Sequence, residues 1–140
     1  MRMLALSLPI LLLSACVSSE DRATDTIADA DQVPAARVLG PAQRCLPTSR
    51  IQNTRVHGSQ VIDFLALGGE TWRNTLRAPC PGLAFEQRFA HETSIGELCR
   101  TDTVQVLRTG GGGLIPGVRC QLGEFVPVEP VDARRDSTPD

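Results

Sequence analysis

Residues 51–76, which decide the fold, read IQNTRVHGSQVIDFLALGGETWRNTL. Three short segments of strand-like composition are separated there by turn residues. The segments are 51–56, 61–67 and 71–76, and the turns between them are His57-Gly58-Ser59 and Gly68-Gly69. Because short loops that contain Gly favour hairpins, the stretch predicts a three-stranded antiparallel meander.

The middle segment alternates between two faces, as a half-buried strand does. Ile62, Phe64 and Ala66 share one face, and Asp63 and Leu65 point the other way. Further strands are expected over 85–89, 103–107 and 118–122, with one helical turn near 94–98. No segment of about ten residues has the apolar period of a helix. We therefore predict an all-β domain of five to six short antiparallel strands, as a meander or a barrel-like rolled sheet.

The first residues have the organisation of an export signal. Met1-Arg2 precedes an apolar stretch of about ten residues, half of what a membrane-spanning helix needs, so residues 1–15 are predicted to be a cleaved signal peptide. Leu13-Ser14-Ala15-Cys16 resembles the lipobox of bacterial lipoproteins, in which the cysteine is acylated and becomes the first mature residue. This resemblance implies a multiply acylated Cys16 in a lipid bilayer. Val17 stands where Asp would resemble an inner-membrane retention signal, which favours the outer membrane, facing the periplasm.

Four cysteines remain once Cys16 is set aside, namely Cys45, Cys80, Cys99 and Cys120. An even number in an exported chain predicts two disulfides that staple a small domain. Three connectivities are possible. The pairing of Cys80 with Cys99 and of Cys45 with Cys120 is favoured, because it nests a short loop inside one that closes the whole domain. No two of these cysteines have the close spacing of a zinc or redox-active pair.

Charge and composition divide the rest of the chain. Residues 16–44 are rich in Ser, Asp, Ala, Thr and Pro and are predicted to form a flexible acidic tether behind the lipidated cysteine. Residues 129–140 are predicted to be a disordered acidic tail. The stapled β domain spans 45–128 and is nearly neutral, so no electrostatic footprint for nucleic acid is present.

The order of the four cysteines, with Trp72 before the second and Asp102 shortly after the third, is similar to that of a family of uncharacterised small bacterial lipoproteins. The resemblance covers roughly residues 45–126. It implies export and a domain of unknown function. It implies no catalytic or binding residues.

The residues that could carry chemistry are few and scattered. A hydrolase or a metal-dependent enzyme would use His57 and His91 with Asp63 or Asp102, and Ser59 is the nearest nucleophile. The sequence around Ser59 lacks the strained elbow of a nucleophilic serine, and the two histidines lie on different predicted strands. We expect the His57 segment to be a hairpin turn.

Other features have simpler structural explanations. Asp102 is expected to cap a turn by accepting backbone N–H bonds. Trp72 is expected in the core or at its rim, with Arg73 and Arg77 as solubilising charges beside it. The run 110–113 is four glycines without a following Lys-Ser or Lys-Thr, so it is expected to be a flexible connection and not a phosphate loop.

Because every catalytic constellation lacks a member or is scattered, we favour a non-enzymatic domain without a cofactor or metal. The expected function is that of a membrane-anchored envelope protein that interacts with the bilayer through Cys16 and with a protein partner through its domain. The alternative is the small periplasmic hydrolase or metal-dependent enzyme built on the histidines.

Overall fold

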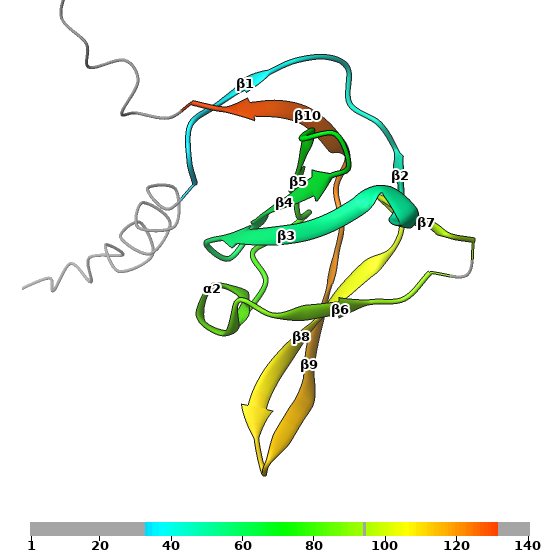
Figure 1. The fold of residues 1–140 in the computed structure, drawn as a ribbon. Coiled ribbons are helices and arrows are strands. Elements are labelled where there is room, and N and C mark those ends of the chain that lie inside the picture. The colour runs from blue at the N-terminus through cyan, green and yellow to red at the C-terminus, as the bar shows by residue number, and fades with distance from the viewer. Residues whose placement is uncertain (1–32, 94, 132–140) are drawn as a thin grey trace, which may run out of the picture.

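A computed structural model of the chain describes residues 33–93 and 95–131 (Figure 1). The predicted signal peptide, Cys16, the tether up to residue 32 and the tail from residue 132 lie outside these residues. The elements in chain order are β1 Ala36–Val38, β2 Cys45–Pro47, the 3₁₀ turn η1 Thr48–Arg50, β3 Ile51–His57, β4 Val61–Ala66, β5 Thr71–Thr75, α2 Leu83–Glu86, β6 Phe89–His91, β7 Glu97–Cys99, β8 Thr103–Gly110, β9 Gly113–Gln121 and β10 Phe125–Pro130.

The strands of the described residues form three antiparallel sheets. The largest has the order β1-β10-β5-β4-β3, a second has the order β6-β8-β9, and β2 pairs with β7 alone. The prediction of an antiparallel all-β fold is confirmed, and the sheets stay open. There are more strands than the predicted five to six because several consist of three residues, too short for a side-chain pattern to reveal.

The predicted meander is present as β3, β4 and β5. Phe64 of β4 lies opposite Thr54 of β3 and Trp72 of β5. Gly58, Gly68 and Gly69 have positive φ in the two turns, a conformation that side-chain-bearing residues rarely adopt. The alternation along β4 is also confirmed, since Ile62, Phe64 and Ala66 belong to the core.

The core lies between the large sheet and the two smaller ones. Phe64 stands at its centre, with the rings of Phe125 and Phe89 edge-on to it at 5.4 and 6.3 Å between centroids. The core also takes in Trp72, as expected. The fully buried Asn74 of β5 holds the link between β9 and β10 in place. Its side-chain N–H donates to the Gly123 carbonyl, and its side-chain oxygen accepts the Gly123 N–H. A side chain at Gly123 would meet the Thr75 carbonyl at 2.1 Å, so only glycine fits.

The domain begins before Cys45 and extends past residue 128, which shortens the predicted tether and tail. β1 pairs with β10 in register from Ala36 opposite Pro130 to Val38 opposite Val128, and Gln43 makes an isolated bridge to Phe125. Residues 33–44 were assigned to the tether, but β-pairing needs only their backbone groups, whatever their side chains. Those groups satisfy the edge of β10 that β5 leaves open.

Two local predictions were wrong. Residues 85–89 were expected as a strand, but the chain forms the short helix α2 and then β6. Gly82, with φ 85°, turns the chain so that Leu83 is buried in the core. The helical turn expected near 94–98 is in part strand β7, because Glu97–Cys99 pairs with β2.

The glycine run also has a definite structure. β8 and β9 continue on both sides of it and form a hairpin whose two turn residues, Gly111 and Gly112, have φ of 57° and 88°. Positive φ at both central residues suits the right-handed twist of a two-residue hairpin turn. The expected flexible connection is therefore a two-residue hairpin turn between β8 and β9.

The two predicted disulfides form, but their pairing differs from the nested one. Cys45 is bonded to Cys99 and Cys80 to Cys120, so the pairing of Cys80 with Cys99 was wrong. Cys45 and Cys99 lie directly opposite each other in the β2–β7 pair, 4.0 Å apart at Cα. Cys80 and Cys120 meet inside the core. The number of residues between two cysteines in the sequence does not predict either of these pairs. The bridges indicate an extracytoplasmic domain.

Trypsin can test this pairing, because an arginine separates each cysteine from the next. Digestion of the oxidised protein is expected to give peptide 45–50 linked to 89–100, and peptide 78–88 linked to 120–134. Mass spectrometry of the digest before and after reduction identifies both pairs. A linked pair of 78–88 with 89–100 would restore the nested pairing and contradict the structure.

Candidate functional site

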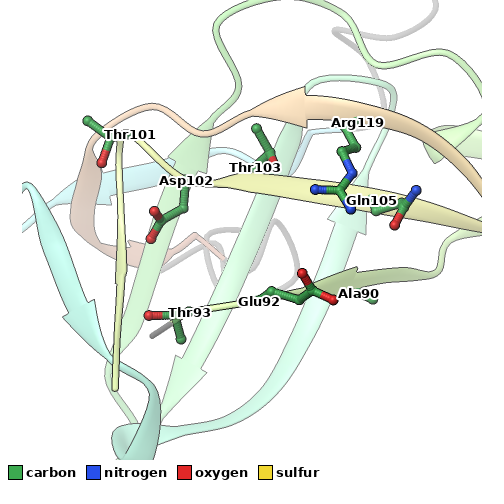
Figure 2. Close-up of a pocket in the computed structure, with 8 residues that line it drawn as sticks. All are labelled: Ala90, Glu92, Thr93, Thr101, Asp102, Thr103, Gln105 and Arg119. Carbon is green, nitrogen blue, oxygen red and sulfur yellow. The ribbon is translucent and has the colours of Figure 1, made fainter. Parts of the chain in front are cut away.

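The outer face of the three-stranded sheet carries a polar pocket with a volume of about 420 Å³ (Figure 2). Val104 and Val106 of β8 point into the core, so Gln105, which lies between them, faces the other way. Ala90, Gln105 and Arg119 form one row across β6, β8 and β9. The pocket is lined by Ala90, Glu92, Thr93, Thr101, Asp102, Thr103, Gln105 and Arg119.

Hydrogen-bonding groups converge on this pocket from several elements. Figure 2 shows Arg119 and Gln105 on one side and Asp102 on the other, with the Glu92 carboxylate pointing toward the space between them. Gln105 is held by donation from its Nε2 to the Gly117 carbonyl, at 3.2 Å. Arg119 makes no ion pair with any residue that the structure describes. Its guanidinium therefore remains available to a ligand.

Asp102 has a structural partner as well as its place in the pocket. One carboxylate oxygen accepts the Cys99 N–H at 2.7 Å, while the Asp102 N–H donates to the Cys99 carbonyl at 2.9 Å. The prediction that Asp102 caps a turn is confirmed. The turn joins β7 to β8 and fixes the carboxylate at the pocket wall.

A second polar cluster lies on the large sheet, on the face of β4 opposite its core residues. Asp63 stands between Arg55 and Arg73 in the strand register. The Arg73 Nε and Nη2 donate to the two oxygens of Asp63 at 2.7 and 2.9 Å, and His57 Nε2 lies 3.0 Å from one of them. The Arg73 Nη1 also donates to the Pro34 carbonyl. The Asp63 carboxylate is buried and fully engaged.

The structure brings together only part of the set predicted for an enzyme. His57 meets Asp63, whereas His91 lies on β6 of another sheet and Asp102 follows β7. Neither histidine belongs to a cluster of three metal-ligating side chains among the described residues. The cluster of that kind that does form consists of Cys45, Glu97 and Cys99. Its two sulfurs are already bonded to each other, so they cannot act as thiolate ligands.

The sequence alone reveals neither the pocket nor the contact of Arg73 with Asp63. Arg73 was expected to be a solubilising charge, but it binds Asp63. Opposite charges that face each other on paired strands are a recognised pattern. The register of β4 and β5 would have revealed the pair, but it needed the lengths of the two turns. Glu92, Gln105 and Arg119 carry no motif. Only the pairing of β6, β8 and β9 brings them together.

Comparison of the chain with models of protein families, with curated proteins and with solved structures gives no match. Within residues 33–93 and 95–131, no helix has the length and apolar character to cross a membrane.

The Asp63 cluster can be tested against an exposed ion pair between η1 and the β4–β5 turn. Asp63→Asn keeps the side-chain shape but leaves the half-buried Arg73 without its counter-charge, and we expect a loss of about 3 kcal/mol of unfolding free energy. In the matched control, Glu70→Gln breaks the exposed pair with Arg50 and is expected to cost less than about 1 kcal/mol. Urea unfolding followed by the fluorescence of the single tryptophan, Trp72, measures both variants. Equal losses of unfolding free energy in the two variants would show that the Asp63 cluster stabilises the fold no more than an exposed ion pair does.

Proposed function

We propose that the chain is a lipid-anchored, non-enzymatic interaction domain of the bacterial cell envelope, held by acylated Cys16 in the outer membrane and facing the periplasm. The anchor is supported by the lipobox-like sequence that ends at Cys16 and by the two disulfides, which form in oxidising compartments. The resemblance to uncharacterised small bacterial lipoproteins points the same way.

The observation that carries the non-enzymatic part is the engagement of the polar side chains. A general base or nucleophile must be able to exchange a proton with a substrate. Asp63 is clamped by a two-pronged guanidinium, and its other neighbour is His57. Asp102 caps a turn. Both carboxylates stabilise the fold. Their positions are therefore explained by a structural role, and a catalytic role is not needed to explain them.

The polar pocket is the surface best suited to a partner. It combines the cation Arg119 and the carboxylate of Glu92 with threonine hydroxyls and the Gln105 amide, so it offers both donors and acceptors. Such a mixture recognises a polar segment of a protein by hydrogen bonds and fits neither an apolar ligand nor the phosphate row of a nucleic acid. We take the partner to be another protein of the envelope.

Acylation can be tested in the producing bacterium by feeding labelled palmitate. The wild-type chain is expected to incorporate the label and to enter the detergent phase on Triton X-114 partition, and Cys16→Ala is expected to remove the label. The double variant Cys45→Ala with Cys99→Ala removes two other cysteines and is expected to keep it. A wild-type chain without label would refute the anchor.

The pocket can be tested by a photo-crosslinking amino acid placed at Thr101, on its rim, and at Thr75, an exposed residue of the large sheet. We expect a crosslinked envelope protein from the Thr101 position only, and we expect Arg119→Ala to weaken that crosslink about tenfold, since hydrogen bonds to a charged group are among the stronger ones. Crosslinks of equal strength at both positions, or a crosslink indifferent to Arg119→Ala, would contradict binding at the pocket.

A further inference from the structure

The far half of the β8–β9 hairpin extends beyond the end of β6. β6 pairs with β8 only as far as Val106, so from Leu107 onward β8 has β9 as its sole strand partner. Figure 1 shows this hairpin extending from the domain at the end opposite β1 and β10. The segment that links α2 to β6 lies beside it, and Arg88 of that segment donates from its Nη1 to the Thr109 hydroxyl.

This projecting end exposes large apolar side chains. Leu114, Ile115 and Val118 of β9 are 54%, 43% and 42% exposed, and Phe85 of α2 is 88% exposed. Leu114 and Ile115 lie at the end of the hairpin, while Val118 and Phe85 lie nearer the domain. Exposed apolar residues are common singly, but two adjacent ones at a projecting end form a surface that a partner would cover. The neighbouring Gly111 and Gly112 have no side chains that could shield them.

The charges of the hairpin have one sign. From residue 103 to residue 123 the chain contains no Asp or Glu, and its two charged residues are Arg108 and Arg119, both exposed. Two acids of other segments lie beside the hairpin: the Glu86 carboxylate of α2 accepts the Thr109 N–H at 3.4 Å, and Glu92 lines the pocket with Arg119 at the hairpin base. An apolar tip with Arg108 beside it, opposite Ile115 in the register, complements a layer of anionic headgroups above acyl chains.

From these observations we propose that the tip of the β8–β9 hairpin inserts into the surface of an anionic lipid bilayer. Leu114 and Ile115 enter the boundary of the acyl chains, and Arg108 contacts the lipid phosphates. This contact does not require acylation of Cys16. With the anchor present, it would give the domain a second point of attachment and a fixed orientation.

The edge of β9 argues against the main alternative, addition of a strand from another protein or from a second copy. Pro116 has no backbone N–H to offer, and the β8–β9 register shifts between Gln105 and Leu107. Proline and irregular pairing are common features of edges that do not accept a further strand. The side chains at the tip are therefore better explained by a lipid surface.

The test uses the full chain purified from the membrane and reconstituted in vesicles that contain phosphatidylglycerol and bromine-labelled acyl chains. Leu114→Trp places a fluorophore at the tip, and Leu67→Trp places one in the β4–β5 turn, where the native leucine is 49% exposed. The native Trp72 is buried and supplies a constant background. We expect bromine to quench the Leu114→Trp signal at least about twofold more than the Leu67→Trp signal.

A further variant identifies the charge. Arg108→Glu, combined with Leu114→Trp, is expected to remove the extra quenching, because the hairpin tip then repels anionic lipid. Equal quenching of the two tryptophans would overturn the proposal. A Leu114→Trp signal that shifts with protein concentration but not with lipid would also overturn it, in favour of a second copy. The intact mass of the same preparation reports acylation of Cys16, so failure of the anchor and failure of the tip are distinguishable.

Discussion

The Cys80–Cys120 disulfide joins the segment that follows the large sheet to β9 of the three-stranded sheet, inside the core. A domain of this size buries only about 60 per cent of its unfolded surface, so two open sheets would hold together weakly without a covalent link. The pair of hydrogen bonds between Asn74 and Gly123 acts at the same crossing. The relative positions of the pocket, the Asp63 cluster and the hairpin tip depend on this link between the two sheets.

The two outer faces show how the same residue types serve different purposes. On the large sheet, Asp63 is surrounded by Arg73 and His57, which satisfy it and leave little for a ligand. On the three-stranded sheet, Arg119 has no partner among the described side chains and faces a pocket. A closed network stabilises a fold, whereas open groups in a concavity can recognise a partner.

Taken together, the proposals describe a domain whose function depends on its position and orientation at the membrane. The proposed lipid anchor would restrict the chain to the membrane surface, and an inserted hairpin tip would restrict its orientation there. The hairpin and the pocket share β8 and β9, so the contact with lipid would set the direction in which Arg119 and its neighbours face. Binding of an envelope protein would then take place at a fixed height above the bilayer.

Length, composition and local alternation determined the fold class, the meander of 51–76 and the presence of two disulfides. They also determined the turn at Asp102, because these features depend on neighbours in the chain. The partners of each cysteine, the pairing of β1 with β10, the contact of Arg73 with Asp63 and the pocket depend on residues distant in sequence. Only tertiary structure decided these, because the choice of which strands pair and which cysteines meet depends on how distant segments pack, and the local pattern of side chains does not specify that choice.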